Sequence, residues 1–130
     1  MDAEAIDHVN LRIPADGVDR AREFYVDALD FSLEGLDTYP DEKPFFSVRL
    51  ADDCVLHLWP DEGFVEPTRR ENYDHVAIRV RESLDEVKAR LDAHDVEIVD
   101  ELEPLGATGV APAVYVHDPF GYRVELKTSG

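Results

Sequence analysis

Two nearly identical heptapeptides, DHVNLRI at residues 7–13 and DHVAIRV at residues 74–80, constrain this chain more than any other feature of its sequence. The repeat indicates that the chain contains two similar modules. In both copies apolar and polar residues alternate, which predicts a β-strand with valine, leucine and isoleucine on one face. His8 and His75 then lie on the opposite face. A histidine that only filled the core would share the apolar stripe, so both are candidates for a functional role.

Each predicted strand precedes a helical pattern and three further strand-like runs. Apolar residues recur at helical spacing within residues 15–31, where Asp16 is a candidate N-cap, and within residues 82–96, where Ser83 and Glu86 form a capping box. Both halves therefore have the order β-α-β-β-β. The strand-like runs are residues 31–35, 45–51 and 54–60 in the first half and residues 96–102, 111–117 and 121–128 in the second.

These patterns predict a single α+β domain made of two paired β-α-β-β-β modules. Module one spans about residues 4–60, and module two spans about residues 73–128. The join, about residues 61–72, has the proline, glycine and charged residues that are typical of a linker. With 130 residues and 44% apolar content, the chain is large enough to bury a hydrophobic core.

Four side chains with metal-binding groups fall at matching positions of the two modules. His8 and His75 open the first strands, while His57 in VLHL and Glu125 in RVEL lie in the last strands. Their apolar neighbours point to the other face of each strand. Three imidazoles and one carboxylate suit zinc, nickel, cobalt, manganese or iron, and they do not suit calcium. The sequence thus predicts one divalent metal ion per site, bound by His8, His57, His75 and Glu125.

The chain is strongly acidic, with 30 acidic residues against 13 basic ones and a formal net charge of -17. Such a surface repels nucleic acid and anionic membranes, so neither is an expected partner. The acids are scattered and lysine is scarce, a composition typical of cytoplasmic proteins from salt-loving organisms. Neither a membrane span nor a signal peptide is evident, and the only cysteine, Cys54, excludes an intramolecular disulfide. We therefore expect a cytoplasmic protein.

The paired modules, the DHV openings and the closing YVHDPFGYRVEL resemble the vicinal oxygen chelate superfamily, which includes glyoxalase I, extradiol dioxygenases and bleomycin-resistance proteins. The resemblance covers about residues 4–127 and, with VLHL, is greatest to small single-domain glyoxalase-like proteins. It implies a curved mixed sheet around a metal ion, with ligands from the first and last strands of both modules. It assigns those ligands to His8, His75 and Glu125, whereas His57 stands where glyoxalase I usually has glutamate.

The resemblance also implies an activity on a small oxygenated substrate. A glyoxalase-like lyase or isomerase moves a proton next to a carbonyl and stabilises the metal-bound enediolate, or a similar oxyanion, that results. Glu125 is the first candidate for the base, and His57 is the second. Candidates for substrate binding are Tyr115 and the two arginines Arg12 and Arg79, which each lie four residues beyond a strand-opening histidine.

Two other activities remain open at this point. An extradiol-type dioxygenase would bind Fe(II) at His8, His75 and Glu125, but residues 106–108 lack the histidine that its signature carries. A bleomycin-resistance-like protein would sequester a ligand without catalysis, although such a binder has no need of four metal ligands. We expect a homodimer, in which exchanged modules would join His8 and His57 of one chain to the second module of the other.

Overall fold

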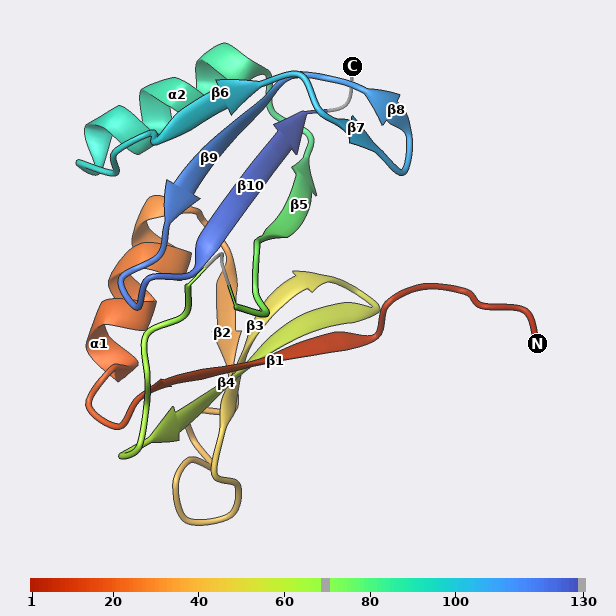
Figure 1. The fold of residues 1–130 in the computed structure, drawn as a ribbon. Helices are drawn as coiled ribbons and strands as arrows, with labels where there is room; N and C mark the ends of the chain where they lie inside the picture. Colours follow the sequence, from red (N-terminus) through yellow and green to blue (C-terminus); the bar gives the residue numbers. More distant parts are fainter. Residues whose placement is uncertain (69–70, 129–130) are drawn as a thin grey trace. The chain divides into compact units, whose positions relative to one another are not determined.

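The computed structural model describes residues 1–68 and 71–128. The chain divides into two compact units, Met1–Val65 and Glu66–Gly130. Each unit holds one four-stranded mixed sheet and its own helical segment (Figure 1). The first strand of each unit pairs in parallel with the last strand, and the remaining pairs are antiparallel. This α+β architecture of two β-α-β-β-β units confirms the predicted fold class.

The first unit has its strands in the order β1-β4-β3-β2, so the two strands farthest apart in the sequence lie side by side. The helical segment connects β1 to β2 (Figure 1). The elements are β1 (His8–Pro14), α1 (Val18–Ala21), the π-helix η1 (Arg22–Ala28), β2 (Ser32–Glu34), β3 (Phe46–Ala51) and β4 (Cys54–Asp61).

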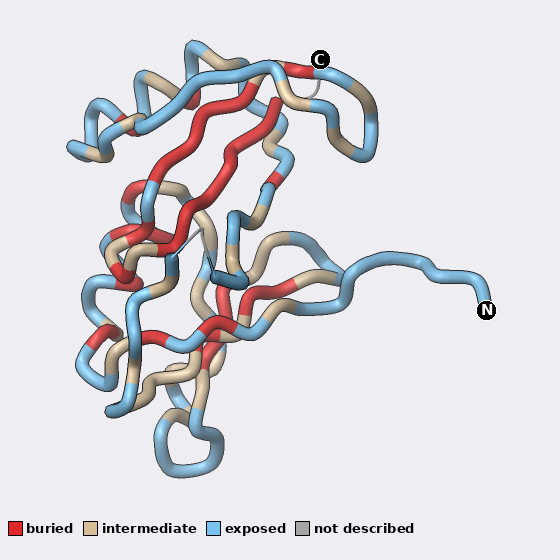
Figure 2. The backbone as a smooth tube through the Cα atoms, viewed as in Figure 1, coloured by how far each residue is buried: buried red, intermediate tan, exposed pale blue. Residues whose placement is uncertain are grey.

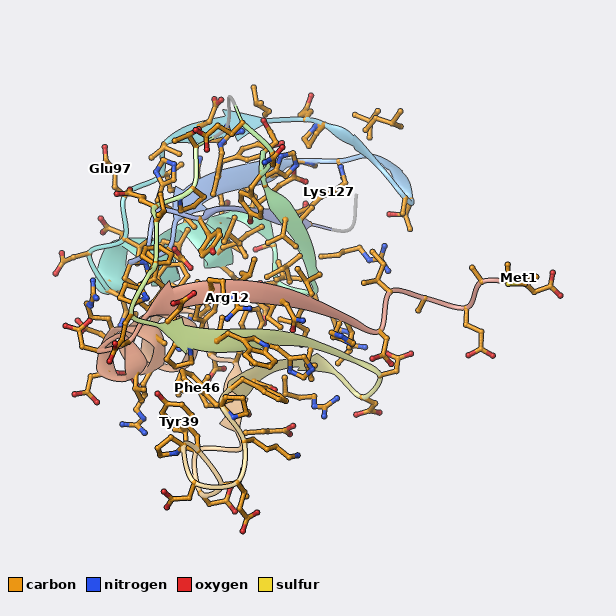
Figure 3. All side chains as sticks on the ribbon, turned by 60° about the horizontal axis from the view of Figure 1, so that its bottom comes forward. Met1, Arg12, Tyr39, Phe46, Glu97 and Lys127 are labelled. Atoms are coloured by element: carbon orange, nitrogen blue, oxygen red, sulfur yellow. The ribbon has the colours of Figure 1, made fainter. Side chains whose placement is uncertain are left out.

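The core of the first unit lies on one face of this sheet. Register pairs Leu58 of β4 with Leu11 of β1 on one side and with Phe46 of β3 on the other, so the three side chains share a face. All three are buried, and burial of each contributes about 1.5–3 kcal/mol. The ring of Phe46 also contacts Tyr39, with 5.7 Å between the ring centres (Figure 3).

The first helical segment differs from the prediction. Only Val18–Ala21 is α-helical, and the chain then continues as a π-helix, in which Leu29 N donates to Phe24 O at 3.0 Å across a wider turn. The prediction that Asp16 caps this helix is wrong, because Gly17 holds the N-cap position and no side chain caps it. The Asp16 carboxylate instead pairs with a guanidinium group one turn later, at 3.5 Å.

The second unit repeats this arrangement and adds a small hairpin. Its sheet has the order β5-β10-β9-β6, in which β5 and β10 are the parallel pair. A two-stranded sheet of β7 and β8, which the sequence analysis did not predict, follows β6. The elements are β5 (Val76–Val80), α2 (Leu84–Ala93), β6 (Asp100–Leu102), β7 (Leu105–Gly106), β8 (Gly109–Val110), β9 (Ala113–His117) and β10 (Arg123–Thr128).

Strands β9 and β10 form the buried centre of the second unit. Figure 2 shows both strands as almost continuously buried. One face is apolar, since Val124 and Leu126 of β10 lie beside Val76 and Ile78 of β5. Helix α2 packs against β9 and buries Leu91. The opposite face of β10 carries charged side chains, which makes it the polar face on which a site can form.

Lys127 lies buried on this polar face and holds the β7-β8 hairpin. Its ammonium group donates hydrogen bonds to the carbonyl oxygens of Pro104 and Ala111, the residues on either side of the hairpin. Gly106 leaves room for the lysine, because a Cβ atom at this position would lie 2.9 Å from Lys127 Cε. The two carbonyl groups compensate the ammonium for part of its lost hydration.

Helix α2 begins with the predicted capping box. Ser83 Oγ accepts a hydrogen bond from Glu86 N at 3.2 Å, and the Glu86 carboxylate accepts one from Ser83 N at 2.8 Å. The hydrogen bonds with Ser83 lower the pKa of Glu86 below its ordinary value. His94 is the C-cap of the same helix. Within the described parts of the chain, no helix is both long enough and apolar enough to cross a membrane.

Replacing Ser83 by alanine should lower the free energy of unfolding by about 1 kcal/mol, because the first turn of α2 loses an acceptor for a backbone N–H group. Urea unfolding followed by circular dichroism measures this difference. Ser32→Ala, the same change at an exposed strand position, is the control and should alter stability by less than about 0.5 kcal/mol. Equal stability of Ser83→Ala and the unaltered protein would contradict the capping role.

Candidate functional site

The polar face of the first sheet carries the two histidines of this unit. Register places Asn10 of β1 beside His57 of β4, and His57 beside Ser47 of β3. His8 lies two residues before Asn10, so its side chain points to the same face. The rings of His8 and His57 are 4.7 Å apart between their centres. The sheet thus brings two residues that are distant in sequence into contact on the face opposite the core.

Each of these imidazoles has one ring nitrogen held by a neighbouring oxygen. His8 Nδ1 lies 2.7 Å from Asp7 Oδ2, and His57 Nδ1 lies 2.7 Å from Ser47 Oγ. Because a carboxylate only accepts hydrogen bonds, the neutral ring of His8 carries its proton on Nδ1 and keeps a lone pair on Nε2. His57 has the same tautomer when its Nδ1 donates to the serine hydroxyl. Histidines oriented in this way are typical of metal sites.

The surroundings of His57 favour its neutral form. Burial lowers the pKa of this imidazole because the charged ring would lose hydration, and the neighbouring His8 lowers it further. Lys43 acts in the same direction, while the Asp7 carboxylate acts against it. A neutral imidazole can either bind a cation or accept a proton. The pair in the first unit is therefore chemically able to bind a metal ion.

The second unit brings His75 and Glu125 together. Glu125 lies on the polar face of β10 and is only 4% exposed. His75 precedes β5, the parallel neighbour of β10, and its Nε2 atom lies 3.2 Å from Glu125 Oε1. The Nδ1 atom of His75 is hydrogen-bonded to the carboxylate of Asp74. This bond repeats the one between His8 and the aspartate before it.

The contact between His75 and Glu125 fits a divalent metal ion. When neutral His75 donates a hydrogen bond from its Nδ1–H group to Asp74, its Nε2 lone pair faces a carboxylate oxygen. Two electron-rich atoms at 3.2 Å attract each other only when a proton or a cation lies between them. Imidazole nitrogen and carboxylate oxygen are also the donor types that zinc, iron and related ions take. The donor set of this pair therefore suits such an ion.

Tyr115 contacts Glu125 from the neighbouring strand. Register places the two residues side by side, and the tyrosine hydroxyl hydrogen-bonds to the glutamate. Burial, and then this contact, raise the pKa of Tyr115 to about 12, so the phenol stays protonated and donates to the carboxylate. The guanidinium of Arg123 lies 4.1 Å from the centre of the tyrosine ring and pairs with Asp100 at 3.4 Å. Tyr115, a candidate for substrate binding, is thus already engaged with Glu125.

The two arginines considered for substrate binding lie on the same polar faces as the histidines. Arg12 has its guanidinium carbon 5.2 Å from the centre of the Trp59 ring, and its Nη1 atom lies 3.8 Å from Asp61 Oδ2. Arg79 is exposed on β5, where register pairs it with Lys127 of β10. Each arginine follows the histidine of its own strand by an even number of residues, which explains the shared face.

The four predicted ligands therefore form one pair in each unit. Within residues 1–68 and 71–128, no three histidine, cysteine, aspartate or glutamate side chains gather closely enough to hold a metal ion. Zinc sites in proteins use at least three protein ligands, so a single pair does not complete a site. What each unit does provide is two ligand-type side chains in contact, with each imidazole oriented by a hydrogen bond.

Three residues that orient the imidazoles were missed by the sequence analysis. Alternation assigns Asp7 and Asp74 to the side of the valines, but their short carboxylates bond to the next ring along the chain. The repeated dipeptide DH could have indicated this role. Ser47 had no comparable sequence pattern, because only the pairing of β3 with β4 brings it to His57.

The second unit also has an open cavity of about 360 Å³. Two residues that support the pair in this unit line the cavity: Asp74, which bonds to the ring of His75, and Arg123, which covers Tyr115. The cavity wall is largely polar and includes the exposed His117. A molecule bound in the cavity would therefore contact groups that orient the ligand pair.

Replacing Tyr115 by phenylalanine should lower the free energy of unfolding by about 1–3 kcal/mol, because the buried Glu125 carboxylate loses a hydrogen-bond donor. Urea unfolding measures the change. Tyr39→Phe is the matched control, since the ring of Tyr39 contacts the ring of Phe46 and this contact does not use the hydroxyl. An unchanged midpoint for Tyr115→Phe would show that its hydroxyl does not support the glutamate.

Comparison with known proteins shows the family and the fold. The sequence matches the Glyoxalase/Bleomycin resistance protein/Dioxygenase superfamily over residues 5–126, and no curated protein sequence matches the chain. A virulence protein from Salmonella typhimurium has 22% sequence identity and a TM-score of 0.78, with 100% of both chains covered. A glyoxalase family protein from Bacillus anthracis also has 22% identity and a TM-score of 0.78, over 100% of this chain and 98% of that one.

Lactoylglutathione lyase from Agrobacterium tumefaciens is more distant, with 19% identity and a TM-score of 0.70 over 99% of this chain and 96% of that one. At such identities these solved structures show the fold alone. The family is shown by the sequence match, which spans nearly the whole chain and includes both ligand pairs. This protein belongs to the Glyoxalase/Bleomycin resistance protein/Dioxygenase superfamily.

Proposed function

We propose that this protein is a divalent-metal-dependent lyase or isomerase of the glyoxalase type that acts on a small oxygenated substrate. One observation supports the proposal above all others. In each unit two ligand-type side chains meet on the polar face of the sheet, and each imidazole has its Nδ1 atom bonded to a neighbouring oxygen. Such orienting bonds are what metal-binding histidines require, and an unconstrained surface histidine has no need of them.

We assign four ligands to one ion: His8 and His57 from the first unit, with His75 and Glu125 from the second. Three imidazoles and a carboxylate suit zinc, nickel, cobalt, manganese or iron. The ligands come either from one chain or, in a homodimer with exchanged modules, from two chains. In both cases each unit contributes its preformed pair, so the ion has to bring together two pairs rather than four separate side chains.

When bound, the ion supplies positive charge that polarises a substrate carbonyl and stabilises the oxyanion formed by loss of a neighbouring proton. Glu125 would accept this proton, since its carboxylate is buried and is oriented by Tyr115 and His75. His57 is the second candidate, because its lowered pKa keeps the imidazole neutral near pH 7. Tyr115 would then act through Glu125 by fixing one side of the carboxylate.

Arg12 and Arg79 would bind an anionic part of the substrate. Each lies four residues beyond a strand-opening histidine, which is about 13 Å along the strand. They would therefore contact a part of the substrate that is remote from the reacting oxygens. A guanidinium recognises a carboxylate through two parallel hydrogen bonds, which would orient an extended substrate relative to the ion.

Adding zinc, nickel or cobalt to metal-free protein should raise its thermal unfolding midpoint, because the ion binds the folded state. A ligand that binds only the folded state stabilises it by about 2.7 kcal/mol when the free ligand concentration is 100 times its Kd. The metal-loaded protein should also convert a hemithioacetal, formed from a 2-oxoaldehyde and a thiol, into a thioester. Scanning calorimetry measures the first effect, and ultraviolet absorbance measures the second. His75→Ala should abolish both.

His94→Ala is the matched control, since His94 caps the end of α2 and should affect neither readout. Absence of metal stabilisation in the unaltered protein would contradict the proposal. Yellow ring-cleavage products from catechols under Fe(II) would identify a dioxygenase instead. Binding of ligands without any turnover would identify a protein that sequesters its ligand.

Asp74→Asn should weaken metal binding by about 10- to 100-fold while leaving the fold intact. The amide can present an N–H group to His75 Nδ1, which moves the ring proton to Nε2 and blocks the lone pair that would bind the ion. Isothermal titration with zinc measures the affinity. Asp37→Asn removes the same charge from an exposed loop and should leave the affinity unchanged. Equal zinc affinities of the Asp74→Asn and Asp37→Asn variants would contradict the orienting role of Asp74.

A further inference from the structure

Two aromatic rings stand beside the histidine pair of the first unit. Phe45 immediately precedes β3, and continuing the β3-β4 register places it directly opposite Trp59. Their rings are stacked, with 4.7 Å between centres and 20° between planes. On the other side of Trp59, register places Arg12 of β1, whose guanidinium carbon lies 5.2 Å from the centre of the indole. The three side chains therefore form a row across three strands.

The distance between the two rings shows how they are oriented on the sheet. A ring separation of 4.7 Å equals the spacing of neighbouring strands, so the two rings stand upright on the sheet with their faces toward each other. Their rims then point away from the sheet. Trp59 is fixed further, because its Nε1 atom donates to Asn10 Oδ1 at 3.1 Å. The row is thus an ordered surface that requires little reorganisation to receive a ligand.

The same row continues into the histidine pair. The Phe45 ring is 4.6 Å from the ring of His57, and the His57 ring is 4.7 Å from that of His8. A molecule whose oxygen atoms are held at these histidines therefore has Phe45 within reach of its adjoining group. The contact follows from the sheet alone, since all of these residues belong to the first unit.

The aromatic rings are not part of the core. They lie on the face opposite Leu56 and Leu58, and both Phe45 and Trp59 are half-buried. Apolar rings that are ordered but only partly covered are typical of ligand-binding surfaces. Because the rim of an aromatic ring is electropositive, it favours the electron-rich face of another ring in an edge-to-face contact.

We propose that Phe45 and Trp59 form a specificity wall, which selects substrates that carry an aryl group next to the oxygen atoms bound at His8 and His57. The proposal rests on the proposed function for the location of those oxygens. Arg12 borders the wall beside Trp59, with its guanidinium carbon 5.2 Å from the centre of the indole, and pairs with Asp61 at 3.8 Å. The substrate class that the wall selects is thus an aryl compound.

The only tryptophan of the chain is part of this wall, which gives a direct probe of binding. Mandelate and lactate differ only in a phenyl or methyl group next to the same hydroxy acid. With zinc-loaded protein, mandelate should change the emission of Trp59 and bind about tenfold more tightly than lactate. Phe45→Leu should reduce this preference to about twofold or less. Phe31→Leu, the same change at another half-buried phenylalanine, should leave the preference intact.

Trp59→Leu provides a second variant, followed by calorimetry because the fluorophore is lost, and it should also remove the preference for mandelate. Equal binding of the two acids, or an unchanged preference in both wall variants, overturns the proposal. Zinc titration of the same protein tests the proposed function separately. If no zinc binds, binding of the two acids is compared without metal. A preference for mandelate that Phe45→Leu abolishes then supports the wall. Equal binding of mandelate and lactate overturns it.

Discussion

The hydrogen bond between each strand-opening histidine and the aspartate before it is the interaction on which the candidate site depends. A neutral imidazole exists as two tautomers, and a carboxylate at Nδ1 selects the one that leaves a lone pair on Nε2. Asp7 and Asp74 provide this selection within single dipeptides. Because the bond joins consecutive residues, each unit orients its own histidine without help from distant parts of the chain. The repeated DH is therefore one structural element that both units share.

Parallel pairing of the first and last strands brings each of these histidines beside a second ligand-type side chain. β1 neighbours β4, although a helical segment and two strands separate them in sequence, and β5 neighbours β10, although a helix and four strands separate them. His8 consequently meets His57, and His75 meets Glu125. If the strands of a unit followed their chain order across the sheet, the first and last would be three spacings apart, about 14 Å. No imidazole could then contact its partner, so the topology itself creates the pairs.

Local sequence patterns predicted most of the fold. The features that they did not predict depend mainly on pairing between strands that are distant in the sequence. Alternation identified the strands of both sheets, and the capping box identified the start of α2, because each depends only on neighbouring residues. The two-residue strands β7 and β8 are too short to show alternation, and Asp16 matched a cap pattern that the backbone did not use. The ligand candidates followed from the duplication. Ser47 and Phe45 could not be found, since only the register of β3 and β4 brings them to His57.

The two units keep one scaffold and differ in what they place on it. Ser47 beside His57 and Tyr115 beside Glu125 occupy equivalent positions, and each hydrogen-bonds to the ligand-type residue on the next strand. Two positions further along, the first unit has the indole of Trp59, where the second has the ammonium of Lys127 bound to backbone carbonyls. The first unit therefore offers two imidazoles next to an apolar wall, and the second offers a buried carboxylate with the residues that contact it. In the proposed function the aromatic wall therefore belongs to the first unit alone, whereas Glu125, the first candidate for the base, belongs to the second, so that a substitution in the wall leaves the surroundings of Glu125 unchanged.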